Sequence, residues 1–218
     1  MVRRRILVVL STVVSIILLL APSASAYEFT NGAYNNSSIG DGVLGVCFEN
    51  NSPVYTHRAI LLSGLQQWGT AKNITLNSNG RCDNDGSNVE VLWESGGLAC
   101  WQALAWVPLR SVTYSSIPVN FNPNCGEGAF WWGGTNPVPN DKVDAYSSAF
   151  HEMGHAYGLH HEDDLAGQQL MESSTPCIIT THGRVTAMSD DDADGIRLRY
   201  QGLGDTGTTF NSSLSCIP

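Results

Sequence analysis

The pattern that most constrains the fold is a short run rich in histidine. Residues 151–161 read His-Glu-Met-Gly-His-Ala-Tyr-Gly-Leu-His-His. Residues four positions apart lie on one face of a helix, so His151 and His155 can present two imidazoles to a single ion. Gly158 can adopt the left-handed conformation that ends a helix, and the chain can then turn back to bring in His161. The fold must therefore contain a helix, a sharp turn and a return around one metal position.

The same run predicts the chemistry of that metal. Three protein nitrogens leave a fourth coordination position open, which distinguishes catalytic zinc from structural zinc. Glu152 directly follows the first histidine, where its carboxylate can reach a water on the ion. The run matches the extended zinc-protease signature H-E-x-x-H-x-x-G-x-x-H, in which five fixed residues make a chance match rare. His160 is a competing ligand, but the spacing from Gly158 favours His161 and predicts a solvated His160.

The N-terminus is typical of a secretory signal peptide. Arg3–Arg5 form a basic start, Ile6–Leu20 an apolar run, and Ala24-Ser25-Ala26 a small-residue cleavage site. The alternative is an uncleaved membrane anchor, but the run falls short of the roughly 20 residues that span a bilayer. We therefore expect a signal peptide at 1–26, a single domain at 27–218, and a secreted protein.

The charge balance excludes several classes of partner. The chain has 11 Lys and Arg against 20 Asp and Glu, a net charge of −9. Removing residues 1–26 removes three arginines and no acid, which leaves 8 against 20 and a net charge of −12. An acidic chain without a basic cluster does not favour nucleic acid or an anionic membrane. Nothing in the sequence indicates more than a monomer.

The six cysteines all follow the predicted signal peptide: Cys47, Cys82, Cys100, Cys125, Cys177 and Cys216. An even number in a secreted chain predicts three disulfides. None lies in a C-x-x-C pair, which argues against zinc ribbons and redox motifs. Fifteen pairings are open, and spacing does not choose among them. A Cys177–Cys216 bond would tie down the C-terminal segment.

Local patterns predict an α+β arrangement with strands before the histidine helix. Ser52 as cap and Pro53 as first residue predict a helix that ends near Gly69. Asp144 can cap the histidine helix and Gly158 can close it. Residues 27–45 are expected to be extended or loosely held. Strands are expected at 88–93, 103–107 and 117–121, and a last helix at 189–200.

Two acidic segments suggest calcium only weakly. Asp190-x-Asp192-x-Asp194-Gly195 is similar to the start of an EF-hand loop. Its twelfth position, however, is Gln201 instead of Glu, and the segment has a helical pattern. Residues 83–86 are foremost a polar turn. A calcium site is thus an alternative that the sequence does not support.

The chain as a whole resembles the metzincin metallopeptidases, and within them most of all the matrixins. Four matches carry the resemblance: the 151–161 motif, Leu170-Met171 as the Met-turn, residues 189–200 as the closing helix, and residues 59–68 as the first helix. The resemblance implies a zincin-like catalytic domain, with a twisted mixed sheet and two long helices. A small C-terminal subdomain with a final helix would follow. Met171 would pack beneath the metal without binding it.

The chain also departs from the matrixin pattern. Glu162 follows the third histidine, as in astacins, where matrixins have Ser. The Met-turn reads Leu170-Met171-Glu172-Ser173 and lacks the tyrosine of both families, so a tyrosine-assisted oxyanion step is not assumed. Gly40-Asp41 is similar to the aspartate that caps zinc in astacin propeptides, but a turn is the commoner use of such a pair. The sequence thus offers no explanation of how such a peptidase would be kept inactive.

These residues predict a secreted zinc endopeptidase. His151, His155 and His161 would hold one Zn²⁺, and Glu152 would be the general base. The resemblance implies that a protein or peptide substrate binds extended in a cleft beside an edge strand, with residues 172–187 lining the pocket for the residue after the cut. Two alternatives stay open. One is a catalytically idle extracellular zinc-binding module, such as an adhesin or toxin component. The other is a zinc hydrolase of non-peptide amides.

Overall fold

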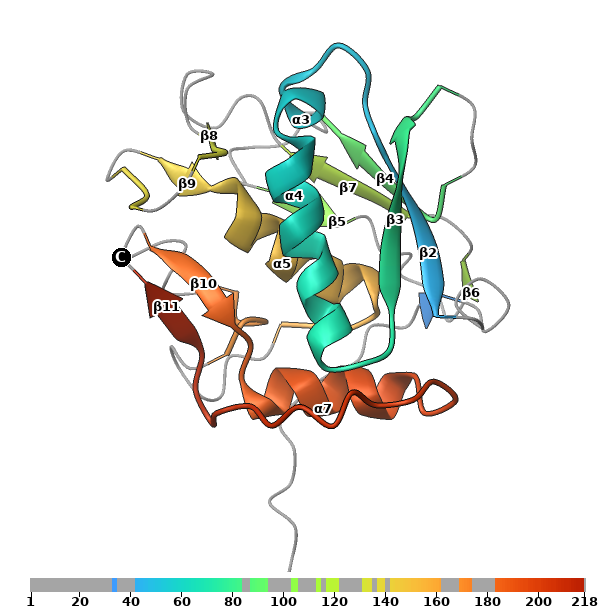
Figure 1. Ribbon diagram of the computed structural model, residues 1–218, viewed down its shortest axis with the longest axis vertical. Coiled ribbons are helices and arrows are strands. Elements are labelled where there is room, and N and C mark those ends of the chain that lie inside the picture. Colours follow the sequence, from blue (N-terminus) through green and yellow to red (C-terminus); the bar gives the residue numbers. More distant parts are fainter. Residues whose placement is uncertain are drawn as a thin grey trace, which may run out of the picture.

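The fold was taken from a computed structural model, shown in Figure 1. It describes residues 33–34, 42–83, 87–93, 103–105, 113–114, 117–121, 131–134, 137–139, 142–161, 169–173 and 183–217. The helices are α3 (Pro53–Thr56), α4 (Arg58–Leu65), the 3₁₀ helix η1 (Gln66–Thr70), α5 (Ala145–Ala156) and α7 (Asp190–Arg199). The strands are β1 (Ala33–Tyr34), β2 (Val43–Phe48), β3 (Thr75–Arg81), β4 (Val89–Leu92), β5 (Ala103–Ala105), β6 (Thr113–Tyr114), β7 (Ile117–Phe121), β8 (Trp131–Trp132), β9 (Val143–Asp144), β10 (Arg184–Ala187) and β11 (Ser215–Ile217).

The main sheet has five strands in the order β3-β2-β4-β7-β5. The first four strands are parallel, and β5 pairs antiparallel with β7 at one edge. This mixed sheet with its helices confirms the predicted α+β class. In β4 and β7 the fully buried apolar residues alternate along the chain and therefore share one face of the sheet: Val89, Val91, Ile117, Val119 and Phe121. The antiparallel edge strand β5 is the one that lies nearest to the histidine helix α5, which packs against it.

Helices α4 and α5 pack tightly against each other in front of the sheet (Figure 1). A Cβ atom at Gly64 would lie 2.3 Å from the carbonyl oxygen of Tyr146, so only glycine permits this approach. Trp68 is fully buried at the end of this helical segment, and its indole N–H donates to the carbonyl of Phe150 at 2.8 Å. These two contacts fix the position and the rotation of the histidine helix α5 relative to the first helical segment.

The predicted first helix is present, with two differences. Pro53 is its first residue, but the chain breaks at His57 into α3 and α4 and continues through Gly69 as η1. Ser52 is the N-cap residue, as predicted, but its hydroxyl makes no cap bond and donates instead to the carbonyl of Glu49 at 2.8 Å. The strand β2 begins inside the segment expected to be extended or loosely held. Its buried Leu44 and Val46 anchor the sheet.

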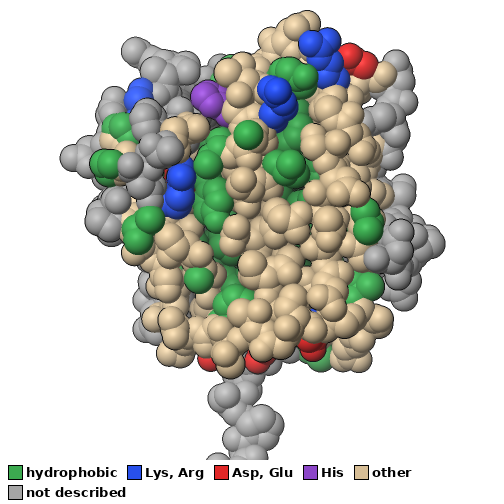
Figure 2. All heavy atoms as spheres, in the orientation of Figure 1, with side chains coloured by type: hydrophobic (Ala, Val, Ile, Leu, Met, Phe, Trp, Pro, Cys, Tyr) green, Lys and Arg blue, Asp and Glu red, His purple; other side chains and the backbone are tan. Residues whose placement is uncertain are grey.

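The C-terminal part begins with α7, which lies across the lower end of the molecule (Figure 1), where Figure 2 shows a few acidic side chains at the surface. Residues 202–217 then pass along α7 and end in β11, which pairs antiparallel with β10. A disulfide joins Cys47 and Cys82, and Cys216 is also disulfide-bonded. Cys177, one of the partners that the sequence left open for it, lies outside the described residues. Within the described part, no helix has the length and apolar character to cross a membrane.

Candidate metal centre

Helix α5 is fixed at its N-terminal end by a buried cap. The carboxylate of Asp144 accepts the backbone N–H of Ser147 at 3.1 Å and its hydroxyl at 2.6 Å, as predicted for the cap residue. Arg184 donates to the same carboxylate from its Nε and from its Nη2, the latter at 2.7 Å. A bidentate pair of this kind sets orientation as well as distance. The helix that carries the histidines therefore has a defined start.

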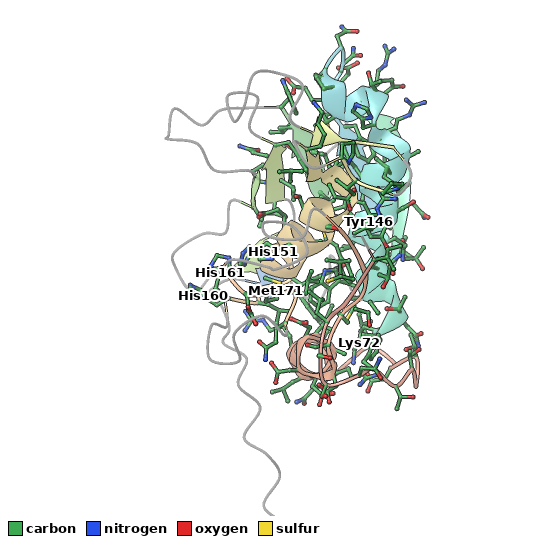
Figure 3. The ribbon with its side chains drawn as sticks, turned by 90° about the vertical axis from the view of Figure 1, so that its left-hand side faces the viewer. Lys72, Tyr146, His151, His160, His161 and Met171 are labelled. Carbon is green, nitrogen blue, oxygen red and sulfur yellow. A yellow bond between two sulfur atoms is a disulfide. The ribbon has the colours of Figure 1, made fainter. Side chains whose placement is uncertain are left out.

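The three predicted histidine ligands converge at the other end of α5. His151 and His155 lie one turn apart on the helix, and Gly158 follows with a φ of +89°, so the chain returns and brings His161 to the same place. The Nε2 atom of His161 lies 3.2 Å from that of His151 and 3.0 Å from that of His155. Figure 3 shows His151 and His161 on one side of α5, with Tyr146 on the opposite side.

The hydrogen bonds of the two helical histidines define which nitrogen is free to bind metal. The Nδ1 of His151 lies 2.7 Å from the carbonyl of Leu170, and the Nδ1 of His155 lies 2.8 Å from that of Leu159. A carbonyl only accepts, so each Nδ1 carries the proton and each Nε2 presents a lone pair. Two lone pairs thus face His161, which can donate at most one proton. A cation between the three nitrogens would satisfy them all.

The spacing of the three rings, and the protonation of His151 and His155, suit zinc. A tetrahedral ion with nitrogen bonds of about 2.0–2.1 Å holds two ligand nitrogens about 3.4 Å apart, close to the 3.0 and 3.2 Å found. Burial lowers the pKa of His151 from 6.5 to about 4, and burial likewise lowers the pKa of His155 well below its usual value. Both rings are therefore neutral at pH 7, which is the form that binds a metal.

Glu152 lies beside this cluster with one carboxylate oxygen engaged. It is 6% exposed, and its Oε2 accepts the backbone N–H of Ala105 on the edge strand β5 at 2.7 Å. Burial raises the pKa of Glu152 from 4.5 to about 8, against the opposing effect of that hydrogen bond. A carboxyl group tuned close to neutrality can both accept and return a proton. The link to Ala105 was not predicted, because a backbone donor has no signal in the sequence.

Met171 lies below the histidines, as the resemblance implied (Figure 3). It is 3% exposed, and its sulfur occupies a space that only a glycine at position 154 leaves open. A Cβ atom at Gly154 would lie 2.3 Å from that sulfur and 2.6 Å from the edge of the Trp68 ring. The methionine, the glycine and the tryptophan therefore fill one common volume under the site.

A further residue of the site, Asp192, was missed as a site residue. Its carboxylate accepts the N–H of Leu170 at 2.8 Å and that of Met171 at 3.1 Å, and it completes a capping box with Ser189. Burial raises the pKa of Asp192, while these hydrogen bonds favour its charged form. Because Leu170 also accepts from His151, the carboxylate of α7 fixes the peptide that orients a histidine. The acidic start of α7 was the available signal, and it predicted only a helix terminus.

The remaining predicted residues divide into two groups. His160 is exposed and contacts the backbone of His161, in agreement with the expected surface position. The acidic run 190–195 is helical, as expected, and within the described residues the metal-binding cluster found is that of the three histidines. Glu162, Gly40-Asp41, residues 84–86 and the 174–182 part of the predicted pocket lie outside the described residues.

Comparison with known proteins gives the family. The matrixin family model, peptidase M10, matches residues 26–201. Among curated proteins the comparison finds no match. Matrixins are zinc metallopeptidases, and the converging histidines of this chain are the group of residues that such an enzyme requires. The match covers well over half of the sequence, and the chain belongs to the matrixin family.

Proposed function

We propose that this protein is a secreted zinc endopeptidase. His151, His155 and His161 would hold one Zn²⁺ through their Nε2 atoms, and Glu152 would be the general base. The observation that carries the proposal is the convergence of three nitrogens beside a buried carboxyl group. The apolar N-terminal run and the Cys47–Cys82 disulfide support an extracellular location.

Side chains of the protein would carry out the proton transfers and hold the reacting groups in place. A bound zinc ion would lower the pKa of water toward 7 and polarise the scissile carbonyl. Oε2 of Glu152 is held by the N–H of Ala105, which leaves Oε1 to take the proton of the attacking water. The same carboxyl group then returns the proton to the nitrogen of the departing amine. Glu152 thus performs both transfers while one of its oxygens stays fixed.

The edge strand β5 offers a place for an extended substrate. Backbone groups alternate in direction along a strand, and Ala105 directs its N–H away from β7 and toward Glu152. Ala103, two residues earlier, faces the same way. A peptide that pairs with this edge would therefore lie alongside the base and the three histidines. This arrangement favours a protein or peptide substrate over a small amide.

The test is cleavage of an unfolded protein by the purified mature protein and by Glu152→Gln. Glu152→Gln keeps the shape and an acceptor for Ala105, but it cannot take a proton. We expect an activity loss of about 10²–10⁴-fold at unchanged zinc content. The matched control is Glu90→Gln, the same change on strand β4, which should cleave like the wild type.

Other outcomes would contradict the proposal in distinguishable ways. Equal cleavage by Glu152→Gln would remove the base role. A wild type that binds zinc tightly but cleaves no peptide bond would favour the idle zinc-binding module. Hydrolysis of small amides alone, with proteins left intact, would favour the non-peptide hydrolase.

A further inference from the structure

The chain continues past residue 201, where the matrixin match ends. We name residues 202–217 the C-terminal strap. Its first anchor is at η1 and the turn that follows. Asp205 forms an ion pair of 2.6 Å with Lys72, which is 1% exposed, and the carbonyl of Gly204 accepts the N–H of Asn73 at 2.9 Å. The strap thus begins with an ion pair to a buried lysine and a backbone hydrogen bond, and not as a loose tail.

The second anchor is at the start of α7. The carbonyl of Asn211 accepts the N–H of Asp190 at 2.7 Å, and Asn211 forms a β-bridge with Ser189. Ser189 is the cap residue that shares the carboxylate of Asp192. The strap therefore holds the turn from which Asp192 reaches the Met-turn.

The third anchor is the pairing of β11 with β10. Val185 lies opposite Cys216, and the hydroxyl of Thr186 donates to the carbonyl of Ser215 at 3.1 Å. Within the described residues β11 is the one strand that pairs with β10. The disulfide of Cys216 adds a covalent restraint to the strap at this point.

Strand β10 in turn holds the N-terminal end of α5. The N–H of Val185 donates to the hydroxyl of Ser147 at 2.9 Å, and Arg184 forms the ion pair with Asp144. Two of the three anchors of the strap therefore act on residues that position the histidines. One acts through α7 and the Met-turn, and the other through β10 and the cap of α5.

We propose that the C-terminal strap is a clamp on the metal centre, so that the affinity of the three histidines for zinc depends on a segment beyond the family match. This proposal rests on the proposed function, because it requires that the three histidines bind zinc. Groups that orient metal ligands indirectly typically change metal affinity about 10–100-fold. The strap acts on such groups and not on the ligands themselves, so we expect a change in zinc affinity at the lower end of this range, about tenfold.

The experiment compares zinc dissociation constants at 25 °C, by competition with a chelator, in the full mature chain and three variants. Deletion of residues 215–218 removes β11 and keeps Leu214. Ser215→Pro with Ile217→Pro keeps Cys216 but disrupts the pairing with β10. Asp205→Asn is the control, because it weakens the strap at its first anchor, away from the metal centre. Amide exchange of Ser147 and Val185, whose N–H groups donate to Asp144 and to the Ser147 hydroxyl, is measured in the metal-free proteins.

We expect both β11 variants to bind zinc about tenfold more weakly and to exchange these amides faster, while Asp205→Asn changes only thermal stability. Unchanged affinity and exchange in both β11 variants would overturn the clamp. So would an equal loss of affinity in Asp205→Asn, which would indicate general destabilisation. If the wild type does not bind zinc, the proposed function fails, and the exchange rates still decide whether the clamp exists.

Discussion

The two ends of helix α5 are completed in different ways. At the N-terminal end, Asp144 and Arg184 neutralise each other, and every bond of the cap is made within the chain. At the C-terminal end, nitrogen lone pairs face one another and a carboxyl group is buried beside them. The first end is held by bonds within the protein, whereas the second gathers three nitrogens that could hold a cation.

One end of α5 thus contributes to the stability of the fold, and the other carries the groups for the chemistry. Groups with perturbed pKa values gather where catalysis is built, and His151, Glu152 and His155 are three such groups in this chain. The capped end fixes the start of the helix, and the other end carries the three histidines and Glu152. The predictions below test that division, from the largest expected effect to the smallest.

The buried carboxyl group should make the metal-free protein sensitive to pH. Because the folded pKa of Glu152 is raised from 4.5 to about 8, the folded state favours the protonated form. Its contribution to stability is complete below pH 4.5 and is lost as the pH rises through 8. The loss is at most about 5 kcal/mol. Urea unfolding of metal-free wild type and Glu152→Gln from pH 5 to pH 9 measures it. Parallel pH curves for the two proteins would contradict the prediction.

The capped end should be sensitive to loss of one charge. Asp144→Ala leaves Arg184, whose side chain is 13% exposed, without its carboxylate and removes the helix cap. Removing one partner of a buried pair costs about 3–5 kcal/mol. Asp144→Asn is the matched control, since it keeps an acceptor for Ser147 and should lose less. Urea unfolding of both variants provides the comparison, and equal losses would show that the cap bond contributes nothing.

Removal of the metal from the histidine end of α5 should lower the thermal stability of the protein. An ion bound only by the folded state at one hundred times its dissociation constant stabilises that state by about 2.7 kcal/mol. Chelation should therefore lower the melting temperature by roughly 5–10 °C. Calorimetry with and without a chelator measures the change. An unchanged melting temperature, with zinc shown to have left, would mean that the histidines do not bind it in the folded state.

The floor of the site should tolerate no added atom. In Gly154→Ala the new Cβ atom would meet the Met171 sulfur at 2.3 Å, and overpacking of this kind costs about 1–3 kcal/mol. The double variant with Met171→Ala should recover part of the loss, because it empties the shared volume. Unfolding of both single variants and the double variant gives the coupling between the two positions. Strict additivity would show that they do not share this space.

Short-range patterns in the sequence predicted the parts of the site that depend on spacing. Four-residue spacing placed His151 and His155 on one face, and Gly158 has the positive φ that its position required. The cap at Asp144 and the start of the last helix near Ser189 were also predicted correctly, since a cap bonds to residues only three positions away. Local chemistry was sufficient wherever both partners lie within one turn.

The long-range contacts could not be predicted in the same way. Asp144 and Arg184 are 40 positions apart, and the partner of Glu152 is a backbone N–H 47 positions away. A backbone group has no residue type by which it can be recognised. Strand β3 was missed for another reason. As an edge strand it exposes most of its residues, so it lacks the apolar alternation that indicates a strand.

The volume shared by Trp68, Gly154 and Met171 also has a consequence for how this sequence can diverge. A larger residue at any one of the three positions is acceptable only with a smaller residue at another, so the three should be inherited as a set. Trp68 belongs to a different part of the chain from the other two, yet it is joined to them through atoms in direct contact. Natural variation at the floor of the metal centre should therefore appear first as paired changes at distant positions in the sequence.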